Sequence, residues 1–220
     1  MGKRVALLLS GCGVMDGAEI QEATYALLAL DNAGAEVACC APNINQTEVV
    51  NHFTGEKTGE TRNILAEAAR IARGKIIDLA KVKAADYNAI IVPGGYGAAK
   101  NLGSYAFDGV KLSINPEVQR VLREFHAGDK PIGTICISPV IVARAFQGTS
   151  VKPTLTIGND AGTAKDIEAL GAEHVTCGVK DCVVDKANKI VSTPAYMYHT
   201  TPSQVFAGIE KLVKAVLELA

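Results

Sequence analysis

Short apolar runs that alternate with amphipathic stretches constrain the fold of this chain more than any other feature. The runs that we predict to be strands are Val5–Leu9, Glu36–Cys40, Ala89–Val92, Pro131–Ile135 and Thr154–Ile157, with a hairpin at 183–191. The stretches with helical spacing are Ile20–Ala33, Thr61–Arg73, 115–127, Ser138–Ala145, 164–170 and 203–219, the last with Ser203 as its N-cap. Wholly apolar strands between helices are typical of a parallel sheet that is covered on both faces. The sequence therefore predicts an α/β fold with a mostly parallel sheet.

Length and composition favour a single domain. The chain has 220 residues, of which 48% are hydrophobic, and it can therefore bury a sizeable core. It contains no internal repeat and no low-complexity linker, so we expect one domain over residues 1–220. The formal net charge of -1 gives no electrostatic attraction to nucleic acid or to an anionic membrane, and we expect neither as a partner.

The N-terminal segment and the cysteines bear on location. Only five apolar residues, Val5 to Leu9, precede the polar Ser10, whereas a secretory signal has an apolar core of ~7–15 residues. The six cysteines include no C-x-x-C pair, and reduced thiols are the default without an export signal. We therefore expect a cytoplasmic protein. No histidines or cysteines have the spacing of metal ligands, so we expect no metal and no other cofactor.

One cysteine, Cys136, stands where a nucleophile would. A predicted buried strand ends at Ile135, and the small Ser138 follows before the next helix. This is the layout of a nucleophile elbow, in which a sharp turn lifts the side chain clear of the sheet. The N-terminus of the following helix would lower the pKa of the thiol. We predict that Cys136 is a catalytic nucleophile, the alternative being a buried cysteine at a strand end.

A glycine-rich segment, Val92-Pro-Gly-Gly-Tyr-Gly97, follows another predicted strand. Glycines at such a position leave backbone N–H groups open and let a ligand approach closely. The amide of Gly94 or Gly95, together with that of Ile137, could form an oxyanion hole. The alternative is a tight turn that needs a positive φ. No G-x-G-x-x-G opens a helix here, which argues against dinucleotide binding.

Two glutamates, Glu19 and Glu22, lie three positions apart at the start of the first predicted helix. This spacing puts both side chains on roughly one helix face. Both lie just past the first predicted strand. We favour Glu22 as a catalytic group and keep Glu19 as a pocket residue. The alternative is that both simply complement the helix dipole.

Two further side chains are candidates for the same pocket. His52 belongs to the polar segment 41–60, and long loops in compact domains are often functional. Cys12, in Ser-Gly-Cys-Gly, follows the first predicted strand and could line the cleft beside Cys136. For Cys12 we favour the alternative of a small residue in a tight loop.

Several long motifs resemble those of a known group. They are SGCGVMDGAEIQEA (10–23), NHFTGE (51–56), ETRNILAEAARIARG (60–74), VPGGYGAAKNL (92–102), LTIGNDAGTA (155–164), GAEHV (171–175) and KIVSTPAYM (189–197). On these motifs the chain resembles the ElbB-type glyoxalases, or enhancing lycopene biosynthesis proteins, a PfpI-like branch of the class I glutamine amidotransferase-like superfamily. The resemblance covers essentially the whole chain. It implies a flavodoxin-like three-layer sandwich, usually a homodimer, and a tie to isoprenoid biosynthesis. It also implies a lyase-type glyoxalase activity that converts glyoxal to glycolate without glutathione.

The resemblance also assigns residues. The superfamily's cysteine falls on Cys136, its carboxylate from the first helix on Glu22, and its amide-donating glycine on Gly94 or Gly95. Many relatives carry a histidine directly after the nucleophile, where this chain has Ile137. Protease or amidase chemistry is then in doubt, because a leaving amine needs a general acid. The mechanism that we expect is addition of a small dicarbonyl to the thiolate, as a hemithioacetal.

Two other functions stay open. A low-pKa exposed cysteine is also an oxidation sensor, so the chain could be a redox-responsive or partner-binding protein whose glyoxalase activity is incidental. A glutaminase-like subunit that delivers ammonia to a partner is a weaker alternative, because Ile137 replaces the paired histidine. Catalytic efficiency separates the first two, since a dedicated enzyme should exceed ~10⁴ M⁻¹s⁻¹ on some small dicarbonyl.

Overall fold

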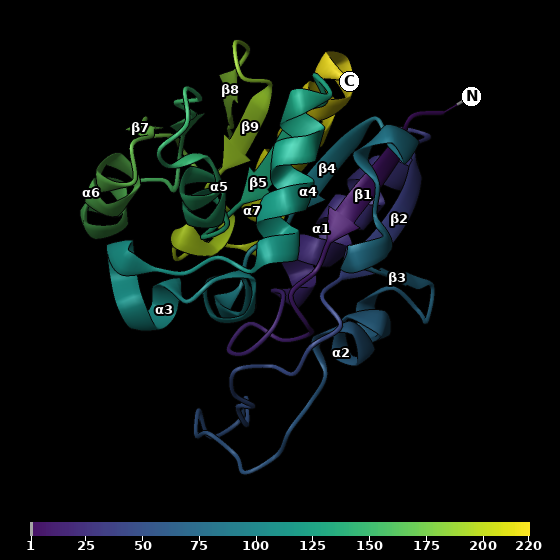
Figure 1. Cartoon of the computed structure of the whole chain (residues 1–220), viewed down its shortest axis with the longest axis vertical. Coiled ribbons are helices and arrows are strands. Elements are labelled where there is room, and N and C mark those ends of the chain that lie inside the picture. The colour runs from purple at the N-terminus through teal and green to yellow at the C-terminus, as the bar shows by residue number, and fades with distance from the viewer. Residues whose placement is uncertain (1) are drawn as a thin grey trace.

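A seven-stranded sheet forms the centre of the protein, whose structure is a computed structural model that describes residues 2–220. Its strands are β1 (Arg4–Leu8), β2 (Glu36–Ala41), β3 (Ile76–Asp78), β4 (Ala89–Val92), β5 (Ile132–Ile135), β8 (Val183–Asp185) and β9 (Ile190–Thr193). The strand order is β3-β2-β1-β4-β5-β9-β8, parallel except for β8, which pairs antiparallel with β9 (Figure 1). A separate small parallel sheet joins β6 (Thr154–Leu155) to β7 (Glu173–His174).

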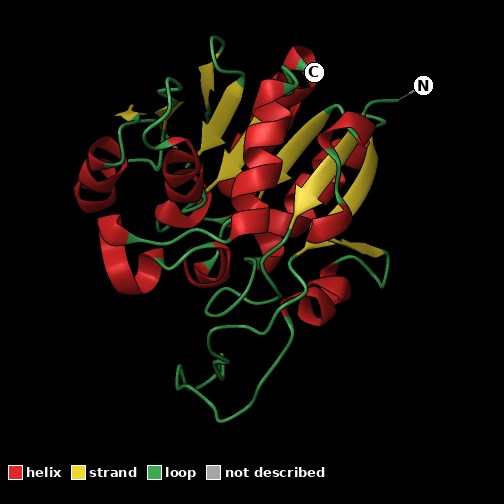
Figure 2. Cartoon of the chain, in the orientation of Figure 1, coloured by secondary structure: helices red, strands yellow, loops and turns green. Residues whose placement is uncertain are grey.

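Helices cover both faces of the sheet and complete a three-layer sandwich (Figures 1 and 2). On one face lie α1 (Ile20–Asn32), α2 (Ile64–Ile71) and α7 (Pro202–Leu219); on the other lie α4 (Pro116–Ala127), α5 (Pro139–Phe146) and α6 (Ala161–Ala169). The short helix α3 is Tyr105–Asp108, 3₁₀ turns cover Leu79–Lys81, Ala84–Asp86, Gly109–Lys111 and Ala195–Met197, and a π-helical turn covers Ala98–Leu102. The fold class predicted from the sequence is confirmed.

The wholly apolar strands are explained by this layering. Successive side chains of a strand point to opposite faces of the sheet. In β1, Val5 and Leu7 therefore join the core beneath α1 and α7, whereas Ala6 and Leu8 join the core beneath α4 and α5. Each strand must be apolar at every position because both of its faces are buried.

The sheet also fixes where a ligand site can form. The chain runs from β1 to β2 and β3 on one side, and then returns to place β4 on the other side of β1, so the strand order reverses between β1 and β4. The segments that follow β1, β4 and β5 leave the sheet at one edge, to which the arrowheads point in Figure 1, while both termini lie at the opposite edge. Open parallel sheets bind ligands at such a reversal.

Helix ends depart from the sequence prediction in several places, and α6 begins at Ala161 rather than at residue 164. The last helix begins at Pro202 with Thr201 as its N-cap, so the assignment of the N-cap to Ser203 was wrong. Proline favours the first helical position, because its missing N–H would be unpaired there in any case. The helix α2 is shorter than predicted, since Asn63 caps it by accepting a hydrogen bond from the Ala66 N–H at 3.0 Å.

The longest segment without regular structure runs from 42 to 63 and extends away from the sandwich (Figure 2). A pair of backbone hydrogen bonds, from Asn51 to Glu56 and from Thr58 to Val49, folds part of it into a narrow hairpin. Within residues 2–220, no helix has both the length and the apolar character needed to span a membrane.

Candidate active site

Cys136 occupies a strained turn between β5 and α5. Its φ of 61° lies in the left-handed region, which is uncommon for a residue with a side chain. The turn is held from two sides: the Cys136 N–H donates to the Thr193 carbonyl at 2.9 Å, and the buried Ser138 hydroxyl lies 2.8 Å from the Ile135 carbonyl and 2.9 Å from the Val92 carbonyl. These contacts bind the elbow to β4 and β9, the strands on either side of it.

Glu22 lies in the first turn of α1 and is fully buried. Its carboxylate accepts a hydrogen bond from the Gly94 N–H at 3.0 Å and one from the Tyr196 N–H at 3.4 Å. The carboxyl group also lies close to Cys136, since a Cβ atom on Gly94 would meet both the Glu22 Oε2 and the Cys136 Cβ, and each of the two groups shifts the pKa of the other. The structure therefore brings together the two residues for which the sequence predicted catalytic roles.

Glu19 has a structural role at the same helix. Its carboxylate caps α1 by accepting a hydrogen bond from the Glu22 N–H at 2.6 Å. In a capping box the residue at the Glu22 position would reach back to the cap residue. Here its side chain turns across the sheet edge to Gly94 and Cys136 instead. Glu19 thus anchors the backbone that carries Glu22, and it also borders the cavity above Cys136.

The two glycines after β4 are required by close contacts. A Cβ atom on Gly94 would lie 2.5 Å from the Cys136 Cβ and 2.8 Å from the Glu22 Oε2. Gly95 has a φ of 91°, and its N–H, together with that of Ile137, faces the Cys136 sulfur. The Gly94 N–H is engaged by Glu22, which leaves the amides of Gly95 and Ile137 as the pair that could hold an oxyanion.

Burial sets the protonation of the Glu22–Cys136 pair. Desolvation, aided by the neighbouring Glu19, raises the pKa of Glu22 to about 8. The pKa of the Cys136 thiol is raised too, first by burial and then by the Glu22 carboxylate, although the amides of Gly95 and Ile137 act in the opposite direction. The prediction that the elbow lowers this pKa was wrong, because desolvation outweighs the positive potential of the turn. The pair should lose its first proton near pH 8, as a coupled unit.

A cavity of about 330 Å³ opens above Cys136. Gly95 and Ile137 line it beside the sulfur, and other parts of its wall come from α3, from α6 and from the segment after β9. A larger and more open groove of about 680 Å³ lies between α1 and α7, where its lining includes Lys3 and Lys211, and does not include Cys136. The smaller cavity is the candidate active site because it alone contains the nucleophile and the amides that face it.

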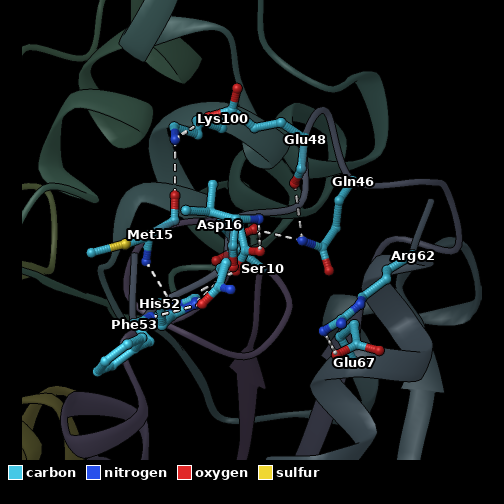
Figure 3. Close-up of polar contacts among 12 residues, drawn as sticks. Ser10, Met15, Asp16, Gln46, Glu48, His52, Phe53, Arg62, Glu67 and Lys100 are labelled. Atoms are coloured by element: carbon cyan, nitrogen blue, oxygen red, sulfur yellow. Dashed lines mark hydrogen bonds and ion pairs between the residues drawn. The ribbon is translucent and has the colours of Figure 1, made fainter. Parts of the chain in front are cut away.

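His52 and Cys12 do not belong to this cavity. The Nε2 of His52 accepts a hydrogen bond from the Met15 N–H at 3.2 Å, and its other ring nitrogen lies 3.1 Å from the Val50 carbonyl (Figure 3). Neither His52 nor Cys12 lines the cavity. The charged groups that shift the pKa of Cys12 belong to Glu67, Arg70 and Asp16, and the first two lie on α2. Both were candidates because their segments follow β1 and β2, but their side chains point elsewhere.

The segment 41–60 is instead a support for the loop after β1. The buried Asp16 accepts a hydrogen bond from the Val50 N–H at 2.8 Å, and Gln46 donates to the Asp16 carbonyl at 3.0 Å (Figure 3). Asn101 donates to the carbonyls of Ser10 and Asp16, and accepts from the Thr47 N–H at 3.0 Å. These buried polar side chains join three segments that are distant in the sequence.

Several residues of the cavity wall had no predicted role. They are Val14, Tyr96, Ala99, Tyr105, Ala106, Asp160, Thr163, Tyr196 and Met197. Some of them fall in motifs that carry the family resemblance, such as Asp160 in LTIGNDAGTA and Tyr196 in KIVSTPAYM. The motifs were therefore a signal, but the packing of α6 and of the segment after β9 against the elbow was needed to show that these side chains share a cavity.

The sequence pattern of the DJ-1/PfpI family matches residues 3–193. The chain belongs to the DJ-1/PfpI family. A crystal structure of an isoprenoid biosynthesis protein with amidotransferase-like domain from Ehrlichia chaffeensis superposes with a TM-score of 0.91 and 39% identity, over 98% of this chain and 99% of that chain. The crystal structure of DJ-1beta from Drosophila melanogaster has a TM-score of 0.58 and 19% identity over 100% of this chain and 96% of its own, and is similar in fold.

Two mammalian relatives match over nearly the whole chain. The ES1 protein homolog, mitochondrial, of Rattus norvegicus is 50% identical over 98% of this chain and 84% of its own length. The glutamine amidotransferase-like class 1 domain-containing protein 3, mitochondrial, of Homo sapiens is 49% identical over 98% of this chain and 83% of its length. These names agree with the amidotransferase-like fold of the DJ-1/PfpI family, and neither states a glyoxalase activity.

The same relatives overturn the expected cytoplasmic location. The rat and human proteins are named mitochondrial, as is the ES1 protein of Danio rerio, which is 32% identical over 98% of this chain and 85% of its own length. The location in their names contradicts the expectation of a cytoplasmic protein. The sequence argument was wrong because a short apolar run such as Val5–Leu9 bears on secretion only, and does not distinguish one reducing compartment from another.

Proposed function

We propose that this protein is a glutathione-independent glyoxalase, which converts glyoxal and other small dicarbonyls to the 2-hydroxy acid through a hemithioacetal on Cys136. The observation that carries the proposal is the closeness of a buried carboxyl group, Glu22, to the thiol of Cys136, beside two N–H groups that face the sulfur. The thiol can bond to one carbon of the substrate, and the carboxyl group can move a proton between neighbouring carbons.

The first step uses the pair after it has lost one proton. The thiolate of Cys136 attacks one aldehyde carbon of glyoxal, and the electron pair of the C=O bond moves to the oxygen. The N–H groups of Gly95 and Ile137 stabilise this oxyanion. Glu22 then gives its proton to the oxygen, which leaves a neutral hemithioacetal and a carboxylate.

The second step is an internal transfer of oxidation state. The Glu22 carboxylate removes the hydrogen of the sulfur-bearing carbon as a proton, and an enediol forms as the other carbonyl oxygen takes up a proton. The hydroxyl proton of the first carbon is released, and Glu22 returns its proton to the second carbon. The product is a thioester of Cys136 with glycolic acid, which water hydrolyses to glycolate and free thiol. One carbon is oxidised while the other is reduced, so the reaction needs no external oxidant.

Amide hydrolysis is less well supported by the same site. A leaving amine must be protonated, and the hydrolases that use cysteine pair it with a histidine. Ile137 follows the nucleophile here, and none of the residues that line the cavity is a histidine. An aldehyde substrate has no amine to expel. The carboxyl group of Glu22 is therefore sufficient for the proposed reaction, whereas an amidase would need a further acid.

Glycolate production from glyoxal tests the proposal. The wild type should exceed ~10⁴ M⁻¹s⁻¹ in kcat/KM. Cys136→Ser should abolish turnover, and Glu22→Gln should reduce it by roughly 10²-fold or more, the scale of acid–base catalysis. Cys182→Ser, which changes a half-buried cysteine outside the cavity, is the matched control and should match the wild type. Equal rates for wild type and Cys136→Ser would refute the proposal.

A redox-responsive protein is the second candidate, because Cys136 is a cysteine that borders an open cavity. That role predicts feeble turnover together with selective oxidation of Cys136 to sulfenic or sulfinic acid by dilute peroxide, which mass spectrometry would detect.

We also propose that the protein is a homodimer, as the family resemblance implies. Light scattering on the purified protein measures this directly, and a monomeric mass would contradict it.

A further inference from the structure

The cavity above Cys136 is larger than glyoxal requires. Its volume of about 330 Å³ falls within the ~300–1,000 Å³ range of pockets that hold drug-sized ligands. A water molecule takes up ~30 Å³ in the liquid, so the cavity corresponds to roughly ten waters. Glyoxal is a two-carbon dialdehyde and would leave most of this space to solvent. The unused volume indicates a substrate with a substituent on its second carbonyl carbon.

The wall that faces this volume is largely apolar. The Tyr105 hydroxyl donates to the Asp166 Oδ2 at 2.6 Å, and the Tyr196 hydroxyl is hydrogen-bonded to Gln21. Because both hydroxyls are already paired, the two tyrosines offer their rings rather than their polar ends to a ligand. Met197 also lines the cavity, and a thioether packs favourably against aromatic groups. An aromatic or branched apolar substituent fits such a wall.

The charged side chains that line the cavity are all acidic. Asp160 and Glu19 line the cavity, and among residues 2–220 no lysine, arginine or histidine does. The Asp160 carboxylate caps α6 by accepting a hydrogen bond from the Thr163 N–H at 2.7 Å. The nearby Lys100 ammonium lies 5.3 Å from the centre of the Tyr96 ring, but it is bound to Glu48 and to the Met15 carbonyl. A negatively charged substituent would therefore meet repulsion without a compensating cation.

We propose, on the basis of the proposed glyoxalase function, that the preferred substrate is a 2-oxoaldehyde whose ketone carbon carries an aromatic or branched apolar substituent without negative charge. Cys136 adds to the aldehyde carbon, and the substituent lies against Tyr105, Tyr196 and Met197. The carbon-bound hydrogen of the hemithioacetal then moves as a proton to the ketone carbon, and hydrolysis gives the 2-hydroxy acid. For phenylglyoxal the product is mandelate, and water is the only co-reactant.

The test compares three substrates with the wild-type protein: glyoxal, phenylglyoxal and 4-carboxyphenylglyoxal. The measured quantity is the initial rate of 2-hydroxy acid formation, by chromatography. Phenylglyoxal should exceed glyoxal in kcat/KM by roughly tenfold or more, the effect of burying one aromatic ring. The 4-carboxy compound should fall below phenylglyoxal by a similar factor.

Asp160→Asn tests the charge argument separately, and asparagine keeps the N-cap of α6. It should raise kcat/KM for the 4-carboxy compound by roughly threefold to tenfold, and change kcat/KM for the uncharged phenylglyoxal by a smaller factor. The matched control is Asp129→Asn, at the opposite edge of the sheet, where asparagine tolerates the φ of 58°. If glyoxal and phenylglyoxal were turned over equally, or if the 4-carboxy compound were preferred, this inference would be overturned and the proposed function would stand. No 2-hydroxy acid from any of the three would refute both.

Discussion

Replacing Glu22 with glutamine should flatten the pH dependence of stability between about pH 4.5 and pH 8. The pKa of this carboxyl group is raised from 4.5 to about 8 by burial, and then by Glu19. Glutamine keeps the shape of the side chain and can still accept the hydrogen bond from the Gly94 N–H, but it does not titrate. The difference between the two proteins therefore reports the proton on Glu22.

The sign and size of the effect follow from proton binding. Below pH 4.5 the carboxyl group of Glu22 is protonated in both the folded and the unfolded chain. Between pH 4.5 and 8 the unfolded chain loses this proton while the folded chain keeps it, so a rising pH favours unfolding. One proton corresponds to about 1.4 kcal/mol per pH unit. The wild type should lose about 4–5 kcal/mol relative to Glu22→Gln over this range, and the difference should level off above pH 8.

Urea unfolding followed by circular dichroism, at pH 5, 6, 7 and 8, measures this difference. Glu210→Gln, which changes an exposed carboxylate on α7, is the matched control and should run parallel to the wild type. If the free energies of unfolding of wild type and Glu22→Gln also run parallel, the folded pair binds no extra proton. The pair would then carry one negative charge already at neutral pH, and the argument from burial would be refuted.

Three other substitutions test the supports of the site. Gly94→Ala should lower glyoxalase turnover by at least about 10²-fold and cost about 1–3 kcal/mol in urea unfolding, because the added Cβ would lie 2.5 Å from the Cys136 Cβ; near-normal activity would contradict this geometry. Ser138→Ala should cost about 1 kcal/mol in the same assay, since it removes the hydroxyl that joins the ends of β4 and β5; no change would show that these contacts are weak. Asn101→Ala should lower the free energy of unfolding by about 1–3 kcal/mol, because that side chain bonds to three backbone groups in two loops. It should also speed proteolysis within 51–60. An unchanged cleavage rate would show that Asn101 does not hold this loop in place.

The sequence alone was sufficient for the fold class and for the pairing of the two main site residues. Short apolar runs such as Ala89–Val92, closed by Pro-Gly-Gly, favour strands with both faces buried, which require helices on both sides of a parallel sheet. The segment after each parallel strand leaves the sheet at the same edge, which brings the segments after β1, β4 and β5 together, and the family resemblance assigned Glu22 to the site with Cys136. Cys136 and Glu22 do lie close together, on either side of Gly94.

The environment of that pair was decided only by tertiary structure. A sequence shows that a helix N-terminus follows Cys136, but not how completely other layers exclude water from the thiol, and desolvation proved to be the larger effect on its pKa. His52 and Cys12 follow the correct strands, yet their side chains lie outside the cavity, because the direction of a loop side chain depends on its contacts. The cavity wall comes from α3, α6 and the segment after β9, which are far apart in the chain. No local sequence pattern predicts that these elements contact one another, because their contact results from the packing of the whole sandwich.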